Sequence, residues 1–149
     1  MVCPFCLSTE TRVSNSRVNK KTARVWRRRN CSGCGKVFST SELPNYEQLI
    51  LIKRNGHKEK FSYPKLFISV WRACEPLKRP QQTSEALVST IISQLLKLAS
   101  DTELTSELVS DVTSQTLRRY NAAAFVRYAS FQSNLNSGRQ LKRALNYHK

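Results

Sequence analysis

Cys3-Pro4-Phe5-Cys6 and Cys31-Ser32-Gly33-Cys34 are two C-x-x-C motifs with 24 residues between them. Two thiolates at this interval can bind one tetrahedral Zn²⁺ with bonds of about 2.3 Å, and four thiolates leave no open position for a substrate or an activated water. The spacing therefore predicts a zinc ribbon that holds one structural metal ion. The predicted ligands are Cys3, Cys6, Cys31 and Cys34.

Disulfides and a redox-active dithiol are the alternative interpretations of these motifs. The basic composition and an N-terminus without a secretory signal favour a reducing cytosol, where disulfides do not persist. Redox C-x-x-C motifs occur in βαβ surroundings, which the flanking sequence does not predict. We therefore favour a zinc site over disulfides or a redox-active dithiol. Gly35 suits a tight turn after the second motif, and the fifth cysteine, Cys74, is expected to be a small buried apolar residue.

The composition changes near residue 44 of the 149-residue chain, which predicts two domains. Residues 1–44 contain nine Lys or Arg against two acids, and residues 45–149 contain sixteen against eight. A segment as short as the first buries too little apolar surface to fold alone, so it depends on zinc. We expect a zinc ribbon over 1–44, a second domain over 45–137 and a basic C-terminal tail over 138–149.

The net charge of +15 and a pI near 10.1 predict a polyanionic partner. The sequence contains no apolar run of about 18 residues, the length that a membrane-spanning helix needs. Nor does it contain a strongly amphipathic basic helix of the kind that lies on a membrane surface. Nucleic acid is therefore the predicted partner, no membrane is involved, and a cytoplasmic location is expected.

Two arms between the cysteine motifs have the composition of paired β-strands. Residues 13–17 and 22–30 would pair antiparallel, with alternate residues on opposite faces. On the second arm this alternation places Arg24, Trp26 and Arg28 on one face and Val25, Arg27 and Arg29 on the other. Cations would then lie on both faces, and Trp26 would be either a core aromatic, which we favour, or a surface for base stacking.

The guanidinium fork of arginine binds phosphate oxygens in pairs and also fits the O6 and N7 acceptors of guanine in the major groove, which admits a pair of strands. We therefore assign the arginines of the first domain to nucleic-acid binding. The predicted contacts are Arg12, Arg17, Arg24, Arg27, Arg28 and Arg29.

From Glu47 onward the pattern predicts a β-hairpin followed by four helices, which is an α+β domain. The apolar strand 49–52 leads to Asn55-Gly56, a strong hairpin signal because both residues tolerate positive φ. The first helix is expected to begin near Pro64 with Ser62 as its cap and to run to Cys74.

Pro76 and Pro80 are expected to end this first helix. The second, capped by Thr83 or Ser84, would carry an apolar stripe to Leu98. The remaining helices are expected from Thr105 or Ser106, with Glu107 in the first turn and Leu108, Val112 and Leu117 facing inward, and from about Ala122 to Leu135.

Catalytic motifs are missing from the sequence. It has no Walker loop, no G-x-G-x-x-G and no Ser-His-Asp, Cys-His or paired-carboxylate arrangement. A nucleotide-processing enzyme is disfavoured, because a closed Cys₄ site has no free coordination position. We predict that the protein is not an enzyme.

Several ordered motifs together resemble the NrdR family, the zinc-ribbon and ATP-cone repressors of bacterial ribonucleotide reductase genes. They are Cys3-Pro4-Phe5-Cys6, Ser16-Arg17, Arg27-Arg28-Arg29, Gly35, Phe38-Ser39-Thr40 with Glu42, Ile52-Lys53-Arg54-Asn55-Gly56 with Glu59 and Phe61, and Ala124-Phe125-Val126-Arg127-Tyr128-Ala129-Ser130. The resemblance covers most of the chain. It implies an N-terminal ribbon that binds operator boxes and an ATP-cone, a β-hairpin plus a four-helix bundle, that binds ATP or dATP.

The resemblance also implies the nucleotide site. Lys53 and Arg54 would hold the phosphates, Lys65 would assist, and Tyr128 would lie near the site. The full set implied is Ile52, Lys53, Arg54, Asn55, Gly56, Glu59, Phe61, Lys65 and Tyr128. From the residues alone, paired cations beside a tight turn make a plausible phosphate site, and a solvated hairpin is the alternative.

A nucleotide-sensing repressor is therefore the predicted function. Repeated DNA boxes would require a homo-oligomer, a dimer or larger, in a bacterial cytoplasm and associated with the nucleoid. The alternative is a general RNA-binding zinc-ribbon protein, for which the charge is equally suitable. The chain departs from the family, which usually has aspartate, at Asn15, Asn55, Ser62 and Asn121.

Overall fold

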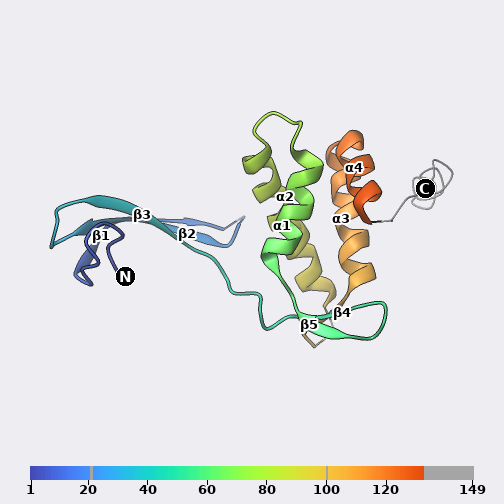
Figure 1. Cartoon of the computed structure of the whole chain (residues 1–149), viewed down its shortest axis with the longest axis horizontal. Helices are drawn as coiled ribbons and strands as arrows, with labels where there is room; N and C mark the ends of the chain where they lie inside the picture. Colours follow the sequence, from blue (N-terminus) through green and yellow to red (C-terminus); the bar gives the residue numbers. More distant parts are fainter. Residues whose placement is uncertain (21, 100, 133–149) are drawn as a thin grey trace. The chain divides into compact units, whose positions relative to one another are not determined.

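The structure, a computed structural model, describes residues 1–20, 22–99 and 101–132. It divides into two units, Met1–Asn45 and a second that begins at Tyr46 (Figure 1). The predicted α+β class is confirmed, with antiparallel strands and a cysteine cluster in the first unit and a small sheet with four helices in the second. The predicted basic tail, 138–149, lies outside the described residues.

The first unit is a three-stranded antiparallel sheet in the order β1-β2-β3. Its strands are β1 Thr11–Asn19, β2 Arg24–Cys31 and β3 Val37–Glu42. The two predicted arms correspond to β1 and β2, whereas β3 was not predicted, because Val37–Glu42 carries no strong strand signal beyond Val37 and Phe38.

The first unit has no apolar core within its described residues. Only Cys3 and Cys31 are buried there, and Trp26 is partly exposed. The expectation that Trp26 joins a ribbon core was therefore wrong, since there is no core for it to join. The cysteine cluster takes the place of a core, which agrees with the predicted dependence of this unit on metal.

In the second unit, four helices surround one core and a small mixed sheet lies at one end of them (Figure 1). The sheet has the order β5-β4-β6, with β4 Ile50–Ile52, β5 Lys58–Lys60 and β6 Glu103–Thr105. The helices are α1 Tyr63–Cys74, α2 Pro80–Leu98, α3 Ser106–Tyr120 and α4 Ala122–Gln132. Cys74 is fully buried in this core.

The start of α2 differs from the prediction. Pro80 begins this helix rather than ending the previous one, and Arg79 precedes it with φ of 56°. Proline suits the first helical position because its missing N–H would have no intrahelical partner there. Ser84, one of the two predicted caps, is instead fully buried within the helix.

The sheet of the second unit contains a third strand in addition to the predicted hairpin. β6 pairs with β4 in parallel, with Leu51 opposite Leu104. This strand was not predicted, because three residues carry too little pattern and their partner lies about fifty positions away. At the hairpin turn only Gly56 of the Asn55-Gly56 pair has positive φ, 79°. No described helix has both the length and the hydrophobicity to span a bilayer.

Candidate metal centre, nucleic-acid interface and nucleotide pocket

The four predicted metal ligands meet in space. Their sulfur atoms all lie within 4.8 Å of one another. Cys3 Sγ is 3.8 Å from Cys34 Sγ, and Cys6 Sγ is 3.5 Å from Cys31 Sγ. A tetrahedron with Zn–S bonds of about 2.3 Å has edges of about 3.8 Å. The donor set and its spacing therefore fit one zinc ion held by four thiolates.

The thiols of this cluster differ in their tendency to ionise. The pKa of Cys31 is lowered to about 6, chiefly because the backbone amide of Cys34 donates a hydrogen bond to its sulfur. The Ser8 backbone amide acts to lower the pKa of Cys6, but hydrogen bonds with the Cys34 and Cys31 thiols raise it, to about 12. Metal binding requires all four cysteines as thiolates. The bound metal cation therefore has to stabilise negative charge on the sulfur atoms that the surrounding protein groups do not stabilise by themselves.

The two cysteine loops have the same backbone geometry. Leu7 N donates to Cys3 O at 3.0 Å, and Gly35 N donates to Cys31 O at 3.0 Å. Both residues lie in the left-handed region, with φ of 60° for Leu7 and 69° for Gly35. Gly35 confirms the predicted tight turn. Leu7 adopts the same conformation at a steric cost of about 1–2 kcal/mol.

Replacing Leu7 by glycine should stabilise the metal-bound ribbon by up to about 1 kcal/mol, because relief of backbone strain exceeds the added entropy of the unfolded chain. Leu7 is 76% exposed, so little packing is lost. Gly35→Ala is the matched control and should destabilise by about 1 kcal/mol from strain alone, since no atom lies within 4 Å of the new Cβ. Thermal unfolding of the zinc-loaded protein measures both, and a destabilised Leu7→Gly variant would contradict the expectation.

The six predicted DNA-binding arginines fall into different environments. Arg27 Nε donates to Glu42 Oε1 at 2.8 Å, and Arg29 Nε donates to Thr40 Oγ1 at 3.2 Å. The guanidinium of Arg17 lies 5.9 Å from the centre of the Trp26 ring. Arg12 and Arg28 are exposed and form no ion pair among the described residues, and Arg24 is partly buried.

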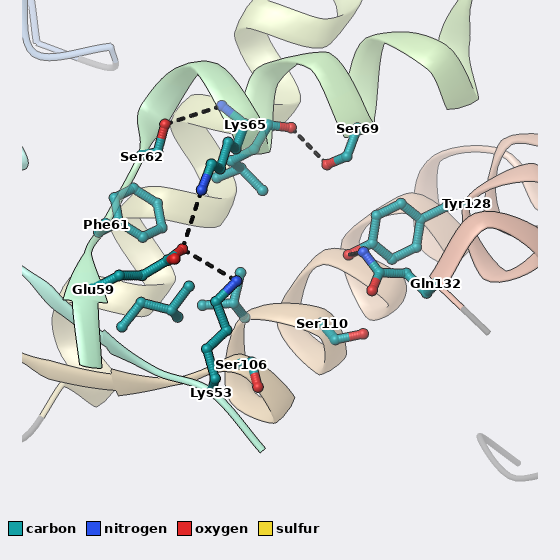
Figure 2. A pocket seen from close by; sticks show the side chains of 13 residues that line it. Lys53, Glu59, Phe61, Ser62, Lys65, Ser69, Ser106, Ser110, Tyr128 and Gln132 are labelled. Atoms are coloured by element: carbon teal, nitrogen blue, oxygen red, sulfur yellow. Dashed lines mark hydrogen bonds and ion pairs between the residues drawn. The ribbon is translucent and has the colours of Figure 1, made fainter. Parts of the chain in front are cut away.

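In the second unit, a cavity of about 200 Å³ opens between the sheet and helices α1, α3 and α4 (Figure 2). Of the nine residues that the resemblance implied, five line this cavity: Lys53, Glu59, Phe61, Lys65 and Tyr128. A more open hollow of about 510 Å³ shares Lys53 and Ser106 with it and is also lined by Arg54 and Asn55. Ile52 lines neither hollow, because its neighbour Leu51 faces the cavity, and Gly56 shapes the turn.

One carboxylate holds the two lysines of the cavity together. Glu59 Oε1 lies 3.1 Å from Lys53 Nζ and 3.3 Å from Lys65 Nζ (Figure 2). The hydrogen bond from Lys53, followed by that from Lys65, lowers the pKa of Glu59 below its ordinary value. Arg54 points elsewhere, with its Nε 3.1 Å from Glu107 Oε1. The two lysines, rather than Lys53 with Arg54, form the cationic side of the cavity.

The other side of the cavity is neutral and polar (Figure 2). Tyr128 is 1% exposed, and Gln132 Nε2 donates to its hydroxyl at 3.0 Å. Burial raises the pKa of Tyr128, although hydrogen bonds with Thr113 and Ser110 act against the rise. Ser106, the first residue of α3, brings the helix N-terminus to the cavity, where backbone N–H groups favour an anion.

Several residues that line the cavity were not predicted from the sequence to do so. They are Leu51, Leu66, Ser69, Ser106, Val109, Ser110 and Gln132, together with Ser62, which was expected only as a cap. Helical spacing would have found some of them, because Ser69 follows Lys65 by four residues and Gln132 follows Tyr128 by four. Ser106 and Ser110 have the same relation on α3.

At three of the four positions where the resemblance implies aspartate, a neutral side chain accepts a hydrogen bond from a nearby backbone amide, at the start of a helix for Ser62 and Asn121 and in the hairpin turn for Asn55. Ser62 Oγ accepts from Lys65 N, Asn121 Oδ1 accepts from Ala124 N, and Asn55 Oδ1 accepts from His57 N. Asparagine and serine cap about as well as aspartate, so the local fold does not require the lost charge. Asn15, on β1, makes no side-chain hydrogen bond within the described residues.

Comparison with known proteins finds two family models along the chain. Residues 1–42 match the N-terminal domain of transcriptional repressor NrdR-like proteins, and residues 49–137 match the ATP cone domain. Among curated proteins, a transcriptional repressor NrdR of Thermosynechococcus vestitus is 39% identical over 130 residues, 87% of this chain and 80% of that protein. Those of Azorhizobium caulinodans and Opitutus terrae are 35% and 38% identical, covering 97% and 87% of this chain and 83% and 85% of their own lengths.

Proposed function

Because the chain belongs to the NrdR family of transcriptional repressors, we propose that it binds operator DNA upstream of ribonucleotide reductase genes through its zinc ribbon. ATP or dATP, bound in the second unit, controls its oligomerisation and its affinity for DNA. A repressor role is non-enzymatic, in agreement with the sequence prediction. The observation that carries the proposal is the presence, in one chain, of an arginine-rich sheet stabilised by a Cys₄ cluster and a cavity with paired lysines.

The ribbon supplies the DNA-binding function in this proposal. Four thiolates saturate a tetrahedral zinc ion, so the metal is structural and carries no reaction. It fixes the ends of β1 and β2, and these strands carry the arginines. The zinc-ribbon domain therefore covers 1–44, and its partner is double-stranded DNA in a bacterial cytoplasm, at the nucleoid.

The cavity supplies the nucleotide-sensing function, within an ATP-cone domain over 45–137. Lys53 and Lys65 stabilise phosphate charge, and in the free protein Glu59 occupies the position between them. Apolar side chains, among them Leu51, Phe61 and Val109, suit the faces of a base. Hydroxyls and the Gln132 amide on the opposite side suit ribose or base edges.

Nucleotide binding can regulate DNA binding only if the nucleotide prefers one assembly of the protein over another. Operator boxes that occur in repeats require at least two ribbons, so the DNA-binding form is a homo-oligomer whose ribbons match the helical repeat of DNA. ATP and dATP would then shift the balance between oligomers that can and cannot present the ribbons to DNA.

The proposal is tested by titrating the zinc-loaded full chain into a labelled duplex from the region upstream of the host's ribonucleotide reductase genes, without nucleotide, with ATP and with dATP. We expect specific binding whose affinity depends on the nucleotide and a parallel change of mass in light scattering. RNA of equal length that competes as well as the duplex at the same salt concentration would instead favour the RNA-binding alternative. Affinity and mass that are indifferent to nucleotide would refute the sensing step.

A further inference from the structure

The register of the ribbon sheet separates its arginines into two groups. Arg28 of β2 lies opposite Asn15 of β1, and Arg27 lies opposite Ser16. Because successive residues of a strand point to opposite faces, Arg28 and Arg27 belong to different faces. We name the first the arginine face, which includes Arg12, Asn15, Arg17, Arg24, Trp26 and Arg28, and the second the valine face, which includes Val13, Ser16, Val25, Arg27, Arg29 and Glu42.

A β-bulge creates the arginine face. Arg12 and Arg17 are five residues apart, so an unbroken strand would place them on opposite faces. The register shifts between Val13 and Asn15, and Ser14 is the extra residue, with its Oγ donating to Arg28 O at 3.2 Å. As a result Arg12 pairs opposite Asn30 and Arg17 opposite Trp26, both on the same face as Arg28.

Among the residues of β1, β2 and β3, acidic charge lies only on the valine face. Glu42 is the only acid in β1, β2 and β3, all of which the structure describes, and it lies opposite Val25 on the valine face. It is 2.8 Å from Arg27 Nε and 3.9 Å from Arg29 Nη2. The hydrogen bond from Arg27 lowers the pKa of Glu42, and the side chain of Arg29 is only 13% exposed. One carboxylate therefore offsets part of the charge of the two valine-face arginines and engages both of them within the sheet.

We propose that DNA docks on the arginine face, with the cross-strand neighbours Asn15 and Arg28 at the base edges, and that Arg27 and Arg29 brace the sheet through Glu42 without contacting DNA. This inference rests on the proposed function, since it assigns the surface by which the ribbon binds its operator. The face assignment also separates Arg28 from Arg27 and Arg29, although the three residues are consecutive in the sequence.

The chemistry of the two faces supports this choice. Within β1, β2 and β3 the arginine face carries no acidic residue, so its guanidinium groups attract phosphates, and counterions are released on binding. Arg28 and Asn15 are both exposed, and these side-chain types form bidentate hydrogen bonds with guanine and adenine respectively. Arg17, stacked over Trp26, holds its charge in a fixed position beside them.

Two neighbouring substitutions compare the faces without changing the net charge. Asn15→Ala removes the amide opposite Arg28 on the arginine face, and Ser16→Ala removes the hydroxyl opposite Arg27 on the valine face. Both residues are exposed on the same strand. With the full chain and the promoter duplex at 0.1 M salt, we expect Asn15→Ala to weaken binding about tenfold, as the loss of a bidentate contact with a base would, and Ser16→Ala less than about threefold.

A second pair tests the two faces by removing charge. Arg28→Ala should lower the slope of log affinity against log salt by about 1, whereas Arg27→Ala should leave it unchanged. Zinc content and melting temperature, equal to those of the unmodified protein, show that each variant is folded. If affinity and slope fall equally for both faces, or more for the valine face, the face assignment is wrong while the repressor proposal stands. If the unmodified protein does not bind the duplex above its non-specific level, both proposals fail.

Discussion

Removing zinc is expected to unfold the first unit and abolish DNA binding while the second unit stays folded. The described part of Met1–Asn45 buries only Cys3 and Cys31, so it has no apolar core to keep it folded without metal. A structural zinc site contributes about 10–16 kcal/mol of apparent binding free energy, which is as large as the whole folding free energy of a typical domain, about 5–15 kcal/mol. The second unit has its own core, in which Val70, Ile91 and Leu117 are fully buried.

Amide spectra of the labelled full chain, recorded before and after chelation, provide the measurement. Ribbon resonances should collapse to random-coil positions while those of the second unit persist, and DNA affinity should fall at least 100-fold, to the level of an unstructured basic segment. Cys34→Ser should reproduce this result. Cys74→Ala is the matched control, because Cys74 lies in the second unit and is not part of the cluster. It should retain zinc and DNA binding, and a ribbon that stays dispersed after chelation would contradict the prediction.

Lys53→Ala is expected to weaken ATP and dATP binding by about 10- to 100-fold. Lys53 is the cation that lines both the cavity and the adjoining hollow. A hydrogen bond to a charged group contributes about 1.5–3 kcal/mol, which corresponds to this range of affinity. The substitution also leaves Glu59 paired with Lys65 alone, 3.3 Å away, which keeps the carboxylate in place against the phosphates.

Lys58→Ala is the matched control for charge. Lys58 lies in the same hairpin, but its Nζ is 2.5 Å from Glu103 Oε1 and it lines neither described hollow. Arg54→Ala should have an intermediate, smaller effect, because the Arg54 side chain is 79% exposed and is directed to Glu107. Calorimetric titration with both nucleotides measures all three. An unchanged dissociation constant for Lys53→Ala would remove this lysine from the site.

Local sequence signals predicted the metal centre and the starts of helices α1 and α3. The cysteine ligands come as two short motifs, and each loop closes on itself through a hydrogen bond within five residues, such as Leu7 N to Cys3 O. Ser62 caps α1 as predicted, and Thr105, one of the two predicted starting residues of α3, caps that helix. Each side chain accepts a hydrogen bond from the backbone amide three positions ahead. Interactions over so few residues depend on residue type and spacing, so they can be recognised without the fold.

The cavity could be predicted only in part. The cationic side comes from the hairpin and the first turns of α1, which are adjacent in sequence. The neutral side comes from α3 and α4, which approach the sheet because β6 pairs with β4 and directs α3 over it. Since this pairing joins segments about fifty residues apart, no local pattern indicated that Ser106 and Ser110 would line the same cavity as Lys53.

The arginines of the ribbon were likewise predicted from the sequence only in part. The sequence determined that a basic, metal-closed strand pair exists, because composition and cysteine spacing are sufficient for that conclusion. It also determined the alternation along Arg24–Cys31, which contains no irregularity. Only the tertiary structure placed Arg12 and Arg17 on the face of Arg28, through an extra residue at Ser14, and Glu42 of β3 beside Arg27 and Arg29. A bulge reverses the direction of the side chains that follow it, and β3 brings the carboxylate of Glu42 to arginines of β2. Both effects arise from strand pairing and not from the identity of any one residue.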